Sequence, residues 1–307
     1  MSASSLLKKA RAALPGLNQA LNFAQGRFEQ VKMNQGKILA QLNRSRSSKR
    51  LADYEFKVFS QWGEDGIIQR LIDVVELGDR TFIEFGVEDF FESNCRYLMM
   101  NDNFAGFVMD GSADNIWACK NSYFYWRYAL QAQQAFITRD NINELLKSSG
   151  FGKDLAILSV DLDGVDYWVT EAIEGFEPRI LIHEYNATFG SERKISVPYD
   201  PAFQRSKAHS SNLYWGASLG ALTYLAEKRG YSLIGTNSAG CNAFYVRNDL
   251  LSDKLEALSA ERGYTESRYR ESRDPSGKLT YISGAERLRV IAGLPVINVE
   301  TGETEVL

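Results

Sequence analysis

Acidic and polar side chains end four apolar segments in the middle of the chain. The segments cover residues 81–86, 106–110, 156–163 and 179–186 and end in Glu84, Asp110, Asp161 with Asp163, and Glu184 with Asn186. Short apolar runs that finish in such side chains are typical of buried parallel strands with a site at their carboxyl ends. We therefore predict that these side chains meet at one edge of a parallel sheet.

The first two strand-end acids suit a nucleoside. Glu84 is followed by Gly86 and by a loop that leads to a helix beginning near Ser93 or Asn94. Asp110 follows the next strand and is placed to accept hydrogen bonds from both ribose hydroxyls. A dinucleotide is disfavoured because no G-x-G-x-x-G run follows the strand. A solvated carboxylate is the alternative interpretation for either acid alone.

The later acids suggest a divalent metal site. Asp161, Asp163, Glu184 and Asn186 would bring hard oxygen ligands from two neighbouring strand ends, which suits Mg²⁺ or Mn²⁺. The alternative is that Asp163 and Asp166 cap the next helix, and that Asp161 alone contacts substrate or acts as a base.

Two side chains are candidate catalytic bases. Asp161 ends a strand, and His209 lies in the polar loop 207–212, where a lid over a substrate would be. His209 can equally be a bystander. His183 lies on a buried strand, and we expect it to be a structural hydrogen-bonding residue.

The elements that position these residues alternate between strands and helices. We predict strands at 81–86, 105–109, 134–138, 155–160, 179–184, 231–235 and 242–246, and helices at 67–75, 93–100, 142–148, 167–174 and 215–228. Five strand–helix units followed by a hairpin predict an α/β protein. Its seven-stranded, mostly parallel Rossmann-like sheet would carry helices on both faces.

Four motifs make a resemblance specific. They are SQWGEDG at 60–66, FIEFGVED at 82–89, VDLDGVDYW at 160–168 and HEYN at 183–186. In these motifs the chain, over about residues 54–250, resembles the FkbM-type S-adenosylmethionine-dependent methyltransferases. The resemblance implies a class I methyltransferase sheet, S-adenosylmethionine as cofactor, and O-methylation of a hydroxyl on a sugar, nucleotide sugar or surface polysaccharide of O-antigen type.

The resemblance also implies roles for cofactor-binding residues. Glu84 and Gly86 would line the methionine side and Asp110 the ribose; Asp140 and Asn141 would lie near the adenine, and Asn94 belongs to the same set. Some such enzymes place a divalent ion beside the sulfonium, which supports the metal interpretation.

The first loop departs from the pattern of this family, because residues 87–91 are acidic and bulky where many methyltransferases carry further glycines. This departure motivates an alternative function, a non-catalytic scaffold that serves a coiled-coil partner. A nucleotide-sugar oxidoreductase or epimerase is disfavoured by the missing glycine fingerprint and by the absence of a Tyr-x-x-x-Lys pair.

The N-terminal fifty residues form a basic arm. They hold ten Lys/Arg and one acid, a net charge of +9. Since the whole chain has a net charge of −4, the remaining residues carry a net charge of −13. The arm suggests an anionic partner, and the acidic body argues against nucleic acid. Apolar residues recur at heptad spacing, with the seam interrupted by a glutamine. They are Leu17, Leu21, Ala24, Phe28, Val31, Ile38 and Leu42, with Gln35 at the interruption.

We predict from this seam a coiled coil over 17–42 that makes a homo-oligomer or binds a partner, with Gly26 and Gly36 at outward positions. A helix packed on the body and a disordered segment are the alternatives. Residues 4–14 form a short basic amphipathic stretch, which suggests weak contact with a membrane or with a polysaccharide assembly complex.

The chain as a whole is expected to divide into a basic arm and linker (1–50), a Rossmann-like domain (51–260) and a C-terminal extension (261–307). The three cysteines are odd in number and widely spaced, so we expect buried thiols in a cytoplasmic protein. The aromatic run 123–128 could stack on sugars or pack in the core. Arginines between 262 and 273 could hold a phosphate or form a solvated face.

Overall fold

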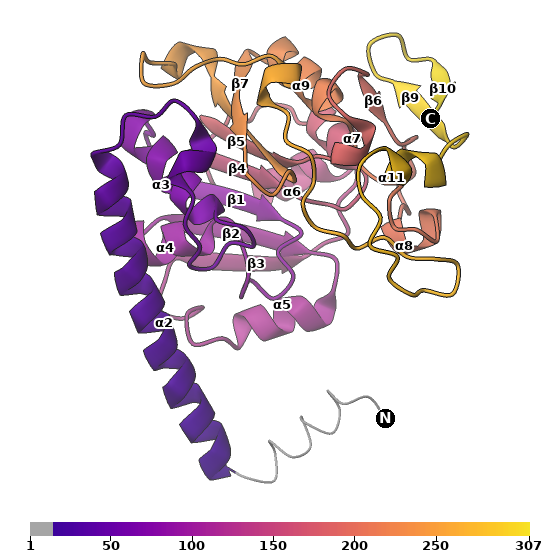
Figure 1. Cartoon of the computed structure of the whole chain (residues 1–307). Helices are drawn as coiled ribbons and strands as arrows, with labels where there is room; N and C mark the ends of the chain where they lie inside the picture. The colour runs from indigo at the N-terminus through magenta and orange to yellow at the C-terminus, as the bar shows by residue number, and fades with distance from the viewer. Residues whose placement is uncertain (1–14) are drawn as a thin grey trace.

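A seven-stranded sheet forms the centre of the protein, whose computed structural model describes residues 15–307, with side chains from residue 26 onwards (Figure 1). The strand order is β3-β2-β1-β4-β5-β8-β7, and β8 is antiparallel to both its neighbours while the other pairs are parallel. The expected seven-stranded α/β sheet is thereby confirmed. The strands are β1 Thr81–Phe85, β2 Ala105–Asp110, β3 Leu130–Gln134, β4 Ile157–Val160, β5 Ile180–Glu184, β7 Tyr231–Thr236 and β8 Asn242–Arg247.

Helices cover both faces of this sheet, as predicted. One face packs against α3 (Glu64–Val74), α4 (Arg96–Asp102) and α5 (Ala113–Lys120), and the other packs against α6 (Ile142–Ser148), α7 (Asp166–Glu171) and α9 (Leu219–Lys228). Successive strand residues alternate between the two cores. Phe82 belongs to the first core and Ile83 to the second, because neighbouring side chains of a strand point to opposite faces.

Two predicted boundaries are wrong, and α5 lies in a segment where no helix is predicted. The third strand is β3 at 130–134 and not 134–138. It is an edge strand that pairs only with β2, and only one of its faces is buried. The polar sequence LQAQQ can therefore form this strand, while the apolar run that follows it lies in the loop. The helix expected from residue 215 begins at Leu219. Ser218 caps it, and Ala217 is instead bridged to Ser196.

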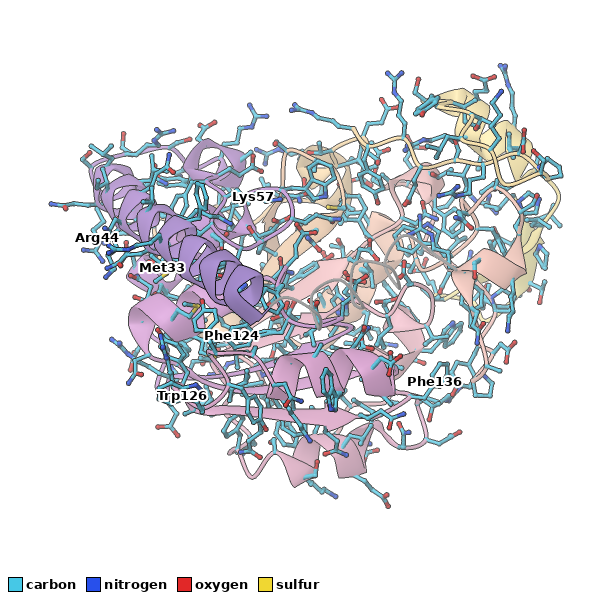
Figure 2. The ribbon with its side chains drawn as sticks, turned by 90° about the horizontal axis from the view of Figure 1, so that it is seen from below. Met33, Arg44, Lys57, Phe124, Trp126 and Phe136 are labelled. Atoms are coloured by element: carbon cyan, nitrogen blue, oxygen red, sulfur yellow. The ribbon has the colours of Figure 1, made fainter. Side chains whose placement is uncertain are left out.

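The arm is a 30-residue helix, α2 (Pro15–Arg44), which packs on the body along one face (Figures 1 and 2). Ala40 is buried with Met33 beside it, and Gly36 is buried rather than outward. A Cβ on Gly36 would come within 2.6 Å of the Val58 side chain, so the glycine permits a close approach of helix and body. The alternative of a helix packed on the body therefore describes this face. Self-association stays a prediction, and the predicted stretch at 4–14 lies outside the described residues.

A buried arginine fastens α2 to the body. The Arg96 side chain, on the first turn of α4, is 1% exposed and forms an ion pair of 3.1 Å with Glu29 of α2. Its guanidinium also lies over the rings of Phe59, Phe91 and Phe124 at 4.0–4.9 Å. The arm helix is thus bound to the helix that begins directly after the first strand-end loop.

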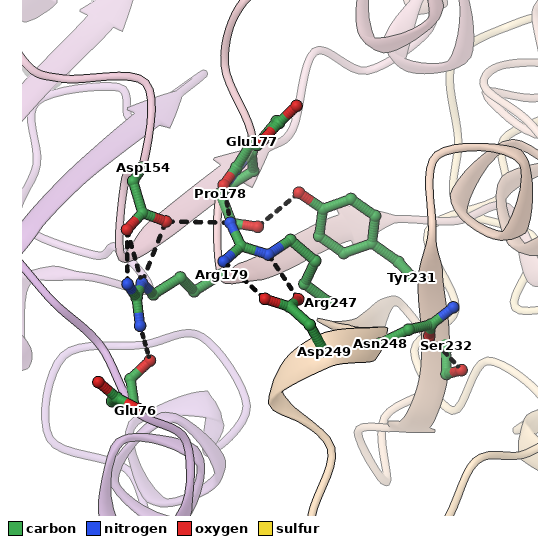
Figure 3. Close-up of polar contacts among 10 residues, drawn as sticks. All are labelled: Glu76, Asp154, Glu177, Pro178, Arg179, Tyr231, Ser232, Arg247, Asn248 and Asp249. Atoms are coloured by element: carbon green, nitrogen blue, oxygen red, sulfur yellow. Dashed lines mark hydrogen bonds and ion pairs between the residues drawn. The ribbon is translucent and has the colours of Figure 1, made fainter.

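Ion pairs join the strands at the amino ends of β4 and β5, opposite to the strand ends that carry the acids (Figure 3). Asp154 precedes β4 and accepts from Arg179, which precedes β5, at 2.5 Å, and from Arg247 of β8 at 3.0 Å. Arg179 also donates to the carbonyl of Glu76 at 2.6 Å. These contacts fasten the starts of β4 and β5 to the end of the antiparallel strand.

The C-terminal residues first pass the carboxyl ends of the main strands, where Tyr269 and Glu271 line a cavity, and then form a small second sheet with β6. The order of this sheet is β10-β9-β6. Its strands and the remaining short helices are β6 Ile195–Ser196, β9 Pro295–Asn298, β10 Thr304–Val306, α8 Arg205–Ala208, α10 Ala260–Gly263, α11 Ala285–Val290, η1 Leu51–Tyr54, η2 Ala187–Phe189 and η3 Asn248–Leu250.

The cysteines agree with the expectation from the sequence. The three cysteines, Cys95, Cys119 and Cys241, are free and buried, as predicted. Among the described residues no helix combines the length and the apolar character needed to cross a membrane.

Candidate functional site

A cavity of about 600 Å³ opens at the carboxyl ends of the parallel strands. Glu84 ends β1, Asp110 ends β2, Asp161 follows β4 and Glu184 ends β5, and all four side chains line it. Gly86, Asn94 and Asp163 line the same cavity. The strand-end residues that the sequence singled out are therefore gathered at one place, because parallel strands end at the same edge of the sheet.

Glu84 organises the first loop from within. It is 4% exposed, and its carboxylate accepts from the Ser93 hydroxyl at 2.7 Å and from the backbone N–H groups of Asn94 and Cys95 at 2.8 and 3.1 Å. Burial raises the pKa of Glu84, and these hydrogen bonds oppose the rise. The acid thus caps α4, whose N-cap residue Cys95 makes no side-chain cap of its own.

Gly86 allows β1 and β4 to approach each other at the cavity. Its φ is +68°, and a Cβ there would lie 1.8 Å from the carbonyl oxygen of Asp161. Any other residue would push the two strand ends apart. The loop that follows is strained, since Glu88 and Phe90 both have positive φ, and strained loops of this kind collect at functional sites.

Asp110 is held in place by three hydrogen bonds. One carboxylate oxygen accepts from the backbone of Glu88 at 2.9 Å, and the other accepts from Ser112 N–H at 2.7 Å and from the Asn115 amide at 3.1 Å. The carboxylate is fixed on the cavity wall with lone pairs left over, which is what recognition of neighbouring hydroxyls requires.

Three acids form a tight cluster on the cavity wall, where Asp161 and Glu184 are half-buried and Asp163 is exposed. One oxygen each of Asp161, Asp163 and Glu184 lies within 4.8 Å of the others. Burial, together with the neighbouring carboxylates, raises the pKa of Asp161 and of Glu184 well above the usual range. Glu184 Oε2 is buried and has no hydrogen-bond partner among the described residues. The pair is therefore arranged to share a proton or to receive a cation.

The loop after β4 is held by Asp166 and not by Asp163. Asp166 accepts from the N–H groups of Leu162 at 2.7 Å and Gly164 at 3.0 Å, and burial raises its pKa to about 6. This leaves Asp163 free of the helix. It adopts a positive φ and reaches Arg205 at 2.9 Å.

Several residues of this site were not singled out from the sequence. Arg205 of α8 bridges Asp163 and Glu271, and its guanidinium lies 4.4 Å from the centre of the Trp215 ring. Tyr269 lines the cavity and stacks on Trp62 at 5.7 Å. Burial, together with Glu184, raises the pKa of Tyr269 well above its usual range. No local motif marks Arg205, Tyr269 or Glu271, because they come from segments far apart in the chain.

Four predicted site residues do not line the cavity. Asn186 is 2% exposed, and its amide donates to the carbonyls of Leu213 and Trp215, so its polar atoms are used inside the fold. His209 bonds Ser211 in its own loop. Asp140 is exposed, while Asn141 closes a turn by accepting from Thr138 N–H and donating to Phe136, and Phe136 itself lines the cavity in their place.

His183 is also not the hydrogen-bonding residue expected. It is 1% exposed, and neither ring nitrogen has a partner among the described residues. Burial lowers its pKa to about 3, so it packs as a neutral ring beside Tyr245.

The aromatic run and the arginines lie away from the cavity. Phe124 is buried in the core against Phe90, and Trp126 is 75% exposed on the surface. Arg262 pairs with Glu256 and Arg273 bonds a backbone carbonyl, so these two belong to the surface interpretation.

Comparisons with known proteins give structural matches alone. No family model matches the chain, and no curated protein matches it. Similar solved structures include the N-terminal domain of EvdMO1 with SAH bound (11% identity, 55% of this chain and 74% of that chain, TM-score 0.35). They also include an O-methyltransferase family protein from Burkholderia thailandensis (12% identity, 64% of this chain and 58% of that chain, TM-score 0.36). A third is an S-adenosylmethionine-dependent methyltransferase from Clostridium acetobutylicum (7% identity, 60% of this chain and 90% of that chain, TM-score 0.37).

These likenesses are distant, and the chain spans little more than half of the Burkholderia protein. The class of fold rests instead on the strand order. Five parallel strands ordered 3-2-1-4-5, followed by a hairpin whose second strand lies antiparallel beside β5, form the class I methyltransferase sheet that the sequence resemblance implied.

Proposed function

We propose that the protein is an S-adenosylmethionine-dependent O-methyltransferase of FkbM type that acts on a hydroxyl of a sugar or polysaccharide. The observation that carries the proposal is the shared cavity. It combines a fixed carboxylate on β2, Asp110, with a half-buried acid pair, Asp161 and Glu184, at neighbouring strand ends. A nucleoside site beside a proton acceptor is what methyl transfer to a hydroxyl requires.

The cofactor would lie along β1 and β2. Asp110 would accept from the ribose hydroxyls, and the loop from Gly86 to Asn94 would face the amino-acid part. Phe136 lines the same end of the cavity, is 52% exposed, and offers a ring face for the adenine. When bound, S-adenosylmethionine supplies the electrophilic methyl carbon.

The acid pair would take the proton of the acceptor hydroxyl. A raised pKa brings a carboxylate closer to the basicity that proton transfer at neutral pH needs, so burial makes Asp161 a better base than an exposed aspartate. Glu184 beside it lets the proton be shared between two oxygens. The pair would take the proton of the hydroxyl as the methyl group passes to its oxygen, while the methyl carbon–sulfur bond breaks and S-adenosylhomocysteine leaves.

The acids also suit a divalent cation. The buried, unpartnered Glu184 Oε2 and the short distances among Asp161, Asp163 and Glu184 fit Mg²⁺ or Mn²⁺. Such an ion would lower the pKa of a bound hydroxyl. Asn186 is not part of this proposed ligand set, and Arg205 would have to release Asp163.

The acceptor is proposed to be a glycan or nucleotide sugar. Tyr269 lines the cavity, and the 40% exposed ring of Trp62 stacks on it. These aromatic rings support this class, because aromatic faces pack well on sugar rings. We propose a cytoplasmic enzyme that works beside a membrane-associated polysaccharide assembly complex.

Calorimetric titration with S-adenosylhomocysteine, with and without Mg²⁺, tests the proposal. We expect micromolar binding to the wild type and loss of binding in Asp110→Ala, with Asp114→Ala as the control on exposed α5 surface. An absence of binding in every condition would refute the enzyme and favour a scaffold that serves a partner of the arm.

A further inference from the structure

An unpartnered apolar stripe runs along the outer face of α2. Phe28, Val31, Ile38 and Leu42 are 72%, 63%, 60% and 61% exposed and occupy the predicted heptad seam. Ala40 and the other body-facing residues lie on the opposite side of the helix. A helix that is packed on one face and apolar on the other presents that second face to a partner.

We propose that a second copy of this chain covers the stripe, and that the two α2 helices pack antiparallel about Gln35. The stripe is self-complementary about this residue, because Phe28 lies seven residues before it and Leu42 seven residues after it. A two-fold axis at Gln35 places Phe28 of one copy near Leu42 of the other. The two glutamine amides meet at the axis, where each can donate to the other.

The charges beside the stripe select this direction. In a parallel pair Arg27 of one copy faces Lys32 of the other, and the symmetry makes this like-charge contact twice. In an antiparallel pair Arg27 lies near Gln41 and Lys32 near Leu39 of the second copy, so no two cations meet. Each body remains on the outer side of its own helix, because α2 is packed on it through the other face.

The stripe supplies a large part of the area that a stable dimer buries. The four exposed side chains offer on the order of 100 Å² each, about half of the roughly 800 Å² per partner that a stable interface buries. Gln35 at the axis and the exposed side chains of Asn34 and Gln41 beside the stripe add to the contact.

Light scattering on the full chain at several concentrations tests the dimer. We expect a mass of about twice 34.6 kDa for the wild type and a monomer for Val31→Glu/Ile38→Glu. The control Gln30→Glu places a charge on an exposed position outside the stripe and should stay dimeric. Circular dichroism should show all three folded. A monomeric wild type, or a stripe variant that stays dimeric, overturns the proposal, as does a monomer that binds anionic vesicles through the stripe.

Cysteine cross-linking tests the direction, since the native thiols are buried. Phe28→Cys/Leu42→Cys should form a disulfide-linked dimer, while Phe28→Cys alone should not. Linking by the single variant overturns the antiparallel arrangement. A variant without residues 1–14 should remain a dimer in light scattering. A monomeric deletion variant would assign the contact to those residues instead.

Discussion

The ion pair between Glu29 and Arg96 should contribute far more to stability than any exposed pair on the same helix. The Arg96 side chain is 1% exposed and that of Glu29 is 11% exposed. Removing one partner of a buried pair costs about 3–5 kcal/mol, because the other charge stays buried. Arg96 keeps hydrogen bonds to the Phe91 carbonyl and the Tyr123 hydroxyl, so we expect Glu29→Gln to cost about 3 kcal/mol, at the low end of that range.

A double-mutant cycle measures the pair directly. Urea unfolding of Glu29→Gln, Arg96→Met and the double variant should give a coupling energy of about 2 kcal/mol or more. The matched control is the exposed pair of Arg44 and Asp73, with side chains 62% and 29% exposed on α2 and α3, where coupling below about 1 kcal/mol is expected. Equal coupling in the two cycles would refute the reasoning that burial makes the contact strong.

The remaining predictions concern the cavity and Asp65, on the first turn of α3, which accepts hydrogen bonds from the preceding loop. Asp161→Asn should abolish methyl transfer and leave S-adenosylhomocysteine affinity within a few-fold in calorimetry; full turnover would exclude Asp161 as the base. Gly86→Ala should lower the free energy of unfolding by several kcal/mol in urea titrations, because the Cβ meets the Asp161 carbonyl at a positive φ. An unchanged free energy of unfolding would contradict the close approach of the two strand ends. Burial raises the pKa of Asp65 to about 6. The charged carboxylate therefore lowers the free energy of unfolding; this cost is absent below pH 3.8, the ordinary pKa, and grows as the pH rises to 6. Relative to wild type, Asp65→Asn should gain up to about 3 kcal/mol between pH 4 and pH 7 in urea titrations, and a flat difference would show that the buried carboxylate carries no such cost.

The sequence located the edge of the sheet where the site lies. Glu84, Asp110, Asp161 and Glu184 each follow an apolar run, and strands that are buried on both faces place such residues at a common edge. The order of the strands and of most helices could be predicted for the same reason, since long apolar periods are a local signal. Helix α5 could not, because only Ile116 and Cys119 of it are buried. Residues 130–134 could not, because an edge strand needs only one buried face and its sequence is polar.

Local pattern could not decide which polar atoms are consumed by the fold itself. Asn186 reads like a ligand at a strand end, yet its amide holds two carbonyls of a loop some 27–29 residues away. Glu84 reads like a cofactor contact, yet its carboxylate caps α4. Only the packed structure shows which hydrogen bonds are already made.

The chain by itself determined the heptad spacing of α2 and the row of acids, because both are periodic features of neighbouring residues. The tertiary structure decided which face of α2 meets the body, through Gly36 and the buried Arg96. It also brought Arg205, Tyr269 and Glu271 to the acids from distant segments. Contacts of this kind depend on how loops close over long separations in sequence, and no local spacing records that closure.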